Sequence, residues 1–153
     1  MDKIITHSEN ETKEIGRNFS LLLIKSGYEK GIIFLEGGLG AGKTVFVKGF
    51  ANGLGIKEDI ISPTFVFVTE YTGILPLYHF DLYRIKNINE IDELGFFEYL
   101  DRKGFVLIEW AEKIENYVKP SIRINIEKIS ENERKIDIEI LERGLKIDER
   151  ALY

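Results

Sequence analysis

The stretch that decides the fold is Gly31-Ile-Ile-Phe-Leu-Glu36 followed by Gly37-Gly-Leu-Gly-Ala-Gly-Lys43-Thr44. Its first half is a continuous apolar run that begins and ends at glycines, which is typical of a strand buried on both faces of a sheet. Its second half is rich in glycine, and residues 44–54 then repeat apolar side chains at helical spacing. The sequence therefore predicts a buried strand, a glycine loop and a helix, in that order.

The glycine loop matches the pattern G-x-x-x-x-G-K-[ST] in full, with Lys43 and Thr44 at its last two positions. In this pattern the glycines let backbone N–H groups turn inward around a phosphate, the lysine reaches the β- and γ-phosphates, and the hydroxyl binds Mg²⁺. We therefore predict an ATP-binding loop made of Gly37, Gly38, Leu39, Gly40, Ala41, Gly42, Lys43 and Thr44.

Two carboxylates end predicted strands elsewhere in the chain. Glu109 follows the apolar run Phe105-Val-Leu-Ile, and Asp81 lies in His79-Phe-Asp81-Leu-Tyr83-Arg84. An acid at the end of a buried strand is the usual partner of such a loop, because it holds Mg²⁺ or the water around it. Either acid could instead be a strand-end residue without a chemical role, and the sequence leaves the separate roles of Asp81 and Glu109 open.

The chain contains no glutamine, so a Gln that orients the attacking water, as in Ras-type GTPases, is excluded. Asp81, Glu109 or His79 remain as candidates for that role, and alternation along a strand places His79 and Asp81 on one face. Arg84 is a candidate arginine finger, although an ordinary salt-bridging arginine is the commoner case. Residues 92–95 fit D-x-x-G, but no N-K-x-D motif exists, which argues against a GTPase.

A further candidate lies in Ser62-Pro-Thr64, which is predicted to be a loop because proline keeps the preceding residue out of the helical region. Thr64 stands between the helix after the glycine loop and the next strand. It could reach Mg²⁺ or the γ-phosphate, and a plain turn fits the pattern equally well.

The remaining patterns complete an α/β prediction. We expect a strand at 3–6 and then a helix that starts at the capping box Ser8 to Glu11 and stops at Gly27. Further along the chain we expect paired strands at 65–72 and 77–81, and one or two helices over 89–100 with an interruption at Gly95. The alternating isoleucines of 122–126 and 136–140 predict a hairpin. The prediction is a P-loop NTPase fold with a mixed central β-sheet, flanking helices and a C-terminal antiparallel hairpin, in one domain over 1–153.

Composition limits the possible partners. The chain has 153 residues, no cysteine and a net charge of −5, and residues 57–109 carry 10 acidic against 5 basic side chains. An acidic surface argues against direct binding to a nucleic-acid backbone, which depends on Lys and Arg. No stretch approaches about eighteen apolar residues, so we expect a soluble cytoplasmic protein without a membrane partner.

Five motifs in order resemble the TsaE/YjeE family of small bacterial P-loop ATPases: GGLGAGKT at 37–44, SPTF at 62–65, HFDLYR at 79–84, ELGFFEYL at 93–100 and EW at 109–110. The resemblance implies an Mg²⁺-dependent ATPase that supports threonylcarbamoylation of an adenosine in tRNA. It implies that the protein does not itself transfer the group, that it acts with TsaB and TsaD, and that it meets tRNA only through them. The tail after Gly144 matches nothing in the family pattern.

The resemblance also assigns residues. It implies that Thr44 and Glu109 hold Mg²⁺ and that Thr64 occupies a first switch position. It also implies that Asp81 occupies the second switch position, where it is a candidate metal ligand or catalytic group, and that Lys43 acts on the phosphates. It further implies that Thr12, at the start of the first helix, approaches the nucleotide. Trp110 is expected to pack close to the site.

Two other functions use the same loop. A small-molecule kinase would transfer the phosphoryl group to a metabolite, but such kinases usually have an arginine-rich lid and no arginine occurs between Arg102 and Arg123. A nucleotide-sensing scaffold would bind without hydrolysis. Slow turnover of the isolated protein, raised by its partners, would favour the ATPase.

Overall fold

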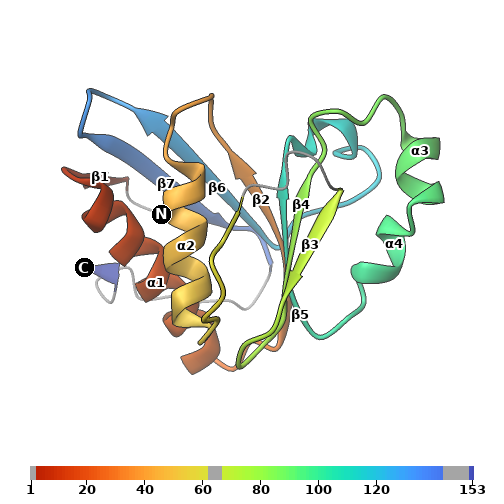
Figure 1. Ribbon diagram of the computed structural model, residues 1–153, viewed down its shortest axis with the longest axis horizontal. Helices are drawn as coiled ribbons and strands as arrows, with labels where there is room; N and C mark the ends of the chain where they lie inside the picture. Colours follow the sequence, from red (N-terminus) through yellow and green to blue (C-terminus); the bar gives the residue numbers. More distant parts are fainter. Residues whose placement is uncertain (1–2, 62–66, 143–151) are drawn as a thin grey trace.

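The computed structural model describes residues 3–61, 67–142 and 152–153 (Figure 1). The strands are β1 (Ile4–Thr6), β2 (Lys30–Glu36), β3 (Val68–Tyr71), β4 (Leu77–Asp81), β5 (Gly104–Glu109), β6 (Ile122–Lys128) and β7 (Arg134–Ile140). The helices are α1 (Glu9–Lys25), α2 (Lys43–Gly53), α3 (Ile88–Glu93) and α4 (Phe96–Tyr99), with a 3₁₀ turn, η1, at Ala111–Lys113.

The seven strands of the described residues join one mixed sheet in the order β1-β7-β6-β2-β5-β4-β3. β2 lies at its centre and runs parallel to both β5 and β6, and β4 runs parallel to β5. The pairs β3–β4, β6–β7 and β1–β7 are antiparallel. The predicted mixed α/β sheet and its C-terminal antiparallel hairpin, β6–β7, are therefore confirmed.

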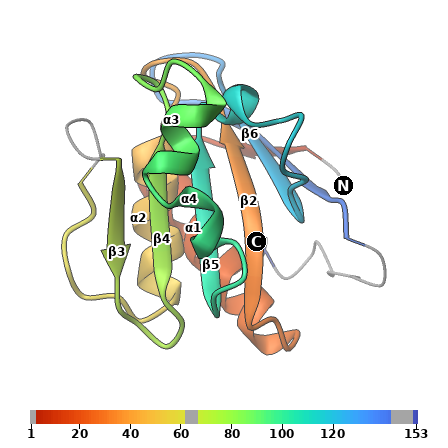
Figure 2. The ribbon, with the colours of Figure 1, turned by 90° about the vertical axis from the view of Figure 1, so that its right-hand side faces the viewer.

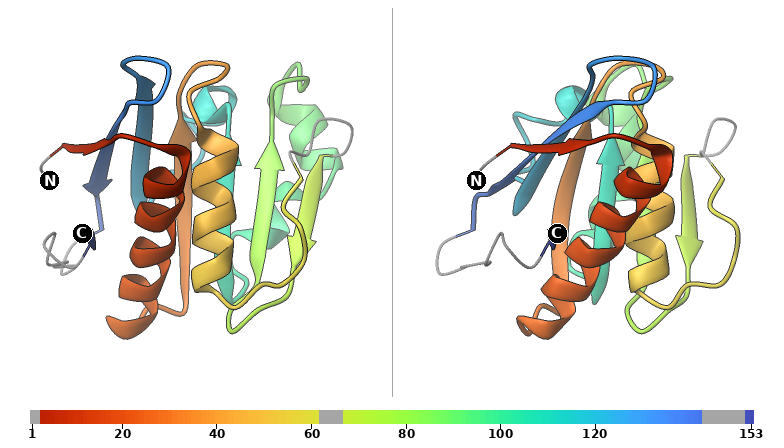
Figure 3. Two further views of the ribbon diagram at one scale, coloured as in Figure 1. Left: turned by 60° about the vertical axis from the view of Figure 1, so that its left-hand side comes forward. Right: turned by 90° about the vertical axis from the view of Figure 1, so that its left-hand side faces the viewer.

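Helices cover both faces of the sheet. α1 and α2 lie side by side on one face (Figure 3), whereas α3 and α4 lie on the other (Figure 2). Along β5, Phe105 and Leu107 belong to the core under α1 and α2, while Val106 and Ile108 belong to the core under α3 and α4. A strand buried on both faces needs apolar residues at successive positions, which explains the unbroken apolar runs in β2 and β5.

α2 is held close to α1 by glycines at their contact. A Cβ added to Gly49 would lie 1.8 Å from the carbonyl oxygen of Lys13, and one added to Gly16 would lie 2.3 Å from that of Phe46. Any larger side chain would push the two helices apart. This close packing fixes the position of α2, whose first turn follows the glycine loop directly.

Local details agree with the sequence patterns with small differences. Ser8 caps α1 by accepting from the Glu11 N–H, but the Glu11 carboxylate accepts from the N–H of His7 rather than from Ser8. Residues 89–100 form two short helices that meet at Gly95, which has a positive φ of 77°. In the predicted strand 65–72, β3 spans Val68–Tyr71, and residues 65 and 66 lie outside the described part.

Two predicted features cannot be followed in the structure. Ser62 to Phe65, including Thr64, and the tail from 143 to 151 lie outside the described residues. None of the helices in the described residues has both the length and the apolar character that spanning a membrane requires.

Candidate active site

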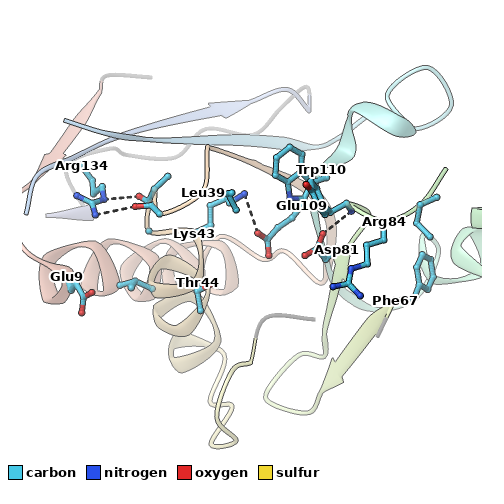
Figure 4. Close-up of a pocket in the computed structure, with 16 residues that line it drawn as sticks. Glu9, Leu39, Lys43, Thr44, Phe67, Asp81, Arg84, Glu109, Trp110 and Arg134 are labelled. Atoms are coloured by element: carbon cyan, nitrogen blue, oxygen red, sulfur yellow. Dashed lines mark hydrogen bonds and ion pairs between the residues drawn. The ribbon is translucent and has the colours of Figure 1, made fainter. Parts of the chain in front are cut away.

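The glycine loop joins β2 to α2 and borders a cavity of about 600 Å³, a size typical of small-molecule sites. Figure 4 shows Glu9 and Arg134 on one side of Lys43, and Asp81, Arg84 and Phe67 on the other. The complete lining is Glu9, Leu39, Gly40, Ala41, Gly42, Lys43, Thr44, Val45, Phe67, Asp81, Tyr83, Arg84, Ile85, Glu109, Trp110 and Arg134.

Two positions of this loop require glycine. Gly37 approaches β6 so closely that an added Cβ would lie 2.6 Å from the carbonyl oxygen of Ile126. Gly42 precedes α2 with a left-handed φ of 99° and gives the helix no side-chain cap. The N–H groups of the first helical turn have no intrahelical partners, so the start of α2 suits an anion.

The two carboxylates lie next to each other at one edge of the sheet. Asp81 ends β4, Glu109 ends β5, and the two residues are direct partners in the register of these parallel strands. Both line the cavity that the glycine loop borders. The structure therefore brings these two acids and the loop together at one cavity.

Glu109 is buried and held by two cationic or polar partners. His79 Nε2 lies 2.5 Å from one carboxylate oxygen, and Lys43 Nζ lies 3.6 Å from the other. Burial alone would raise the pKa of Glu109, but the hydrogen bond and charge of His79 and the charge of Lys43 outweigh it and lower that pKa. Glu109 is thus kept ionised.

Asp81 has the opposite electrostatic character. Burial raises its pKa, and the negative charge of Glu109 adds to this, against a lowering by the Tyr83 N–H, which donates to Asp81 Oδ1 at 2.9 Å. Two neighbouring carboxylates whose pKa values move in opposite directions are suited to different tasks. Asp81 binds a proton more readily, whereas Glu109 carries the permanent charge.

His79 contacts Glu109 and does not line the cavity. Its side chain is fully buried and is not among the lining residues. Nε2 faces the carboxylate, and Nδ1 has no hydrogen-bond partner in the part of the chain that the structure describes. His79 therefore orients Glu109, and direct contact with a water in the cavity, the role considered from the sequence, does not fit this position.

Trp110 has an unusual backbone. Among the described residues it is the only non-glycine residue with positive φ, at 60°. Its ring lies 4.8 Å from Lys43 Nζ and stacks at a tilt on Tyr83, with ring centroids 4.9 Å apart. Left-handed backbone costs free energy at a bulky residue and is frequent at functional sites. As expected, Trp110 packs against the site.

Thr12 occupies a different place from the one the resemblance implies. It is buried, its hydroxyl lies 2.7 Å from that of Thr6, and it does not line the cavity. Glu9, one helical turn earlier on α1, does line it. Gly37 and Gly38 belong to the loop without lining the cavity, while the other predicted loop residues from Leu39 to Thr44, and Arg84, all line it.

Two basic residues, Arg134 and Lys113, support the cavity wall, and no sequence pattern indicates this role. Arg134, at the start of β7, donates from Nε to the Ala41 carbonyl at 2.9 Å. Lys113, in η1, donates to the carbonyls of Tyr83 and Ile85, both at 2.5 Å. Each fixes a backbone segment of the cavity wall from a distant part of the chain.

The oxygen donors fit Mg²⁺ in its usual binding mode. Thr44, Asp81 and Glu109 offer a hydroxyl and two carboxylates at the cavity. The described residues contain no group of three or more His, Cys, Asp or Glu that could hold a metal ion. Mg²⁺ in phosphate-transfer sites is typically bound by only one or two carboxylates together with substrate phosphates, so this donor set suits it.

These observations define an α/β protein in which a glycine loop, between a central parallel strand and a helix, faces two strand-end carboxylates. A family model described as "Threonylcarbamoyl adenosine biosynthesis protein TsaE" matches residues 6–136. The chain therefore belongs to the TsaE family.

Individual relatives of this chain support the same family assignment. The chain is 43% identical over 133 residues to the tRNA threonylcarbamoyladenosine biosynthesis protein TsaE of Bacillus subtilis, covering 86% of this chain and 80% of the relative. It is 34% identical to the protein of the same name from Treponema pallidum, covering 89% and 98%. The crystal structure of Bacillus subtilis YdiB superposes with a TM-score of 0.71 at 38% identity, covering 88% of this chain and 82% of that one.

Proposed function

We propose that the chain is an Mg²⁺-dependent ATPase of the P-loop class that supports threonylcarbamoyladenosine formation in tRNA. Family membership supports the pathway, and none of the reported relatives supports the kinase alternative. One observation carries the ATPase activity: the cavity brings the loop, Thr44, Asp81 and Glu109 together. Phosphate-binding backbone and metal-binding oxygens then face a single ligand.

The loop and α2 bind the phosphates in this proposal. Backbone N–H groups of Gly40 and of Gly42 to Thr44, together with the positive end of the α2 dipole, attract the triphosphate. Lys43 leaves the Glu109 carboxylate, which it contacts at 3.6 Å, and turns its charge to the β- and γ-phosphates. Thr44 and Glu109 hold the Mg²⁺, which neutralises charge on the phosphates when bound.

Asp81 orients the attacking water. Its raised pKa makes it the better of the two acids for accepting a proton, while the ionised Glu109 is the better metal ligand. Arg84 lines the same cavity and, in this proposal, stabilises the developing negative charge. A contact between Thr64 and Mg²⁺ or the γ-phosphate remains a prediction from the sequence.

Partners complete the cycle in this proposal. TsaB and TsaD, implied by the family resemblance, bind next to the cavity and accelerate an otherwise slow hydrolysis. The chain carries a net charge of −5, so tRNA contacts it only through these partners. A cytoplasmic location remains a prediction from the sequence.

The test is phosphate release from Mg-ATP by the purified chain, alone and with TsaB and TsaD. We expect slow release alone and a clear rise with both partners. Equal rates in the two conditions would contradict activation, and stoichiometric transfer of phosphate to a metabolite would instead identify a kinase. Thr44→Ala should weaken binding only when Mg²⁺ is present.

Lys43→Ala separates the ATPase from a scaffold that needs no nucleotide. If tRNA modification by the reconstituted proteins persists when this variant no longer binds ATP, the chain acts as a scaffold. Loss of modification together with ATP binding shows that the function requires bound nucleotide. Lys48→Ala is the matched control, because Lys48 lies exposed on the same helix and does not line the cavity.

A further inference from the structure

Arg134 connects the C-terminal hairpin to the glycine loop through backbone carbonyl groups. Nη1 donates to the carbonyls of Ser130, Glu131 and Glu133 in the β6–β7 turn, at 2.9, 3.2 and 3.0 Å. Nε donates to Ala41 at 2.9 Å, and Nη2 lies 3.4 Å from the carbonyl oxygen of Gly40. One planar guanidinium thus spans two segments that are more than 85 residues apart in the chain.

The backbone of Arg134 is itself firmly placed. It pairs with Lys128 on β6 and with Thr6 on β1, so strands flank it on both sides. The outer part of its side chain lies against the loop, since a Cβ added to Gly42 would be 3.5 Å from Arg134 Nε and 3.9 Å from Cδ. The guanidinium therefore reaches the loop from a rigid support.

These bonds set the direction of a loop N–H group. In a trans peptide the C=O and N–H point in opposite directions, so a carbonyl of Ala41 that is held toward Arg134 turns the Gly42 N–H away from it. The Ala41 N–H is already used within the loop, where it donates to Gly38. A phosphate-binding loop needs its N–H groups inward and its carbonyls bonded outside, and Arg134 supplies that outside partner.

We propose that Arg134 is a positioning residue of the nucleotide site, which presets the loop for phosphate before ATP arrives. This inference rests on the proposed function. Lysine cannot replace arginine here, because a single ammonium group cannot reach both the turn and the loop in one plane. Arg134 contributes by fixing the conformation of the loop, and not only by its positive charge.

The test compares Arg134→Lys and Arg134→Gln with Lys135→Gln. Lys135 is the neighbouring cation on β7, it pairs with Glu127 at 3.1 Å, and it does not line the cavity. Without nucleotide, amide hydrogen exchange at residues 40–43 should become faster in both Arg134 variants and stay unchanged in Lys135→Gln. Their Kd for Mg-ATP should rise about tenfold, as expected from losing hydrogen bonds to a charged group.

Turnover provides a second readout. With saturating ATP and both partners, kcat should stay near the value of the unmodified chain while KM rises, because Asp81 and Glu109 are unchanged. Normal exchange and normal affinity in Arg134→Lys would overturn the proposal. An affinity loss that merely follows a fall in Tm would also overturn it, since it would show a general structural role.

Failure of this inference can be distinguished from failure of the proposed function. If the unmodified chain does not bind Mg-ATP, the proposed function fails, whatever the Arg134 variants do. The exchange measurement uses no nucleotide and tests the contact between Arg134 and the loop on its own.

Discussion

The Lys43 ammonium lies 3.6 Å from a Glu109 carboxylate oxygen, and both side chains are almost completely buried. The cation of the glycine loop is thus bound to the acid that ends β5, and its other neighbour is the ring of Trp110. The ATP binding proposed above must compete with this ion pair. The resting position of Lys43 links the stability of the protein to the chemistry of its site.

Lys43→Ala should therefore destabilise the fold as well as abolish nucleotide binding. Removing one partner of a buried ion pair leaves an uncompensated charge and costs about 3 kcal/mol in the free energy of unfolding. Urea denaturation at pH 7 measures this cost, with Lys48→Ala as the exposed control. A variant as stable as the control would show that His79 alone compensates Glu109.

Asp81→Asn should separate turnover from binding. Loss of the group that accepts the proton lowers kcat about 100-fold or more, whereas the affinity for Mg-ATP stays close to that of the unmodified chain. Phosphate release and equilibrium binding measure the two quantities. Unchanged turnover would remove Asp81 from the chemistry.

The same variant has a defined pH signature in stability. The pKa of Asp81 is raised from 3.8, so above that value the folded chain holds the proton better than the unfolded chain does, and stability falls as pH rises through the folded pKa. Asp81→Asn removes this loss. Its Tm relative to the unmodified chain should increase from acid to neutral pH, and a constant difference would contradict the assignment.

Lys113→Met should loosen one wall of the cavity. Its ammonium binds the carbonyls of Tyr83 and Ile85, so without it the segment that carries Arg84 loses two hydrogen bonds. Amide exchange over residues 83–86 should accelerate, and kcat should fall about tenfold or more because catalytic groups become misplaced. Lys119→Met, at an exposed position shortly after η1, is the control. Unchanged exchange in Lys113→Met would contradict this role.

Tyr28→Phe should remove a loss of stability that the unmodified chain shows at alkaline pH. Burial raises the pKa of Tyr28 from 10.0 to about 12, with a smaller contribution from the charge of Glu142. The stability that the neutral phenol contributes is therefore complete below pH 10 and is lost as pH rises toward 12. Denaturation at pH 8 to 11 should show a smaller decline in the variant. An identical decline would contradict the shift.

The sequence predicts the centre of the fold well because its signals are local. The unbroken apolar run of β2, the glycines after it and the helical period of α2 are all contiguous, and the strand-end position of Glu109 can be read in the same way. Glu109 and Asp81 then meet because parallel neighbouring strands end at one edge of a sheet.

The parts that could not be predicted depend on distant segments. Arg134 reaches Ala41 across 93 positions, and Lys113 reaches Tyr83 across 30. Neither lies in a recognisable motif, since a side chain that donates to a backbone carbonyl requires no particular partner residue. Thr12 is the opposite case, a residue that the resemblance places near the nucleotide. Its hydroxyl instead forms a hydrogen bond with that of Thr6 in the interior, away from the cavity.

The pairing of β1 with β7 has a consequence for biosynthesis. Ile4 lies opposite Ile136 in this pair, so β1 finds its partner strand only after the much later β7 has been synthesised. Contacts between such distant positions slow folding. The sheet can be completed only after synthesis has passed β7, and until then the first strand leaves the ribosome without its partner.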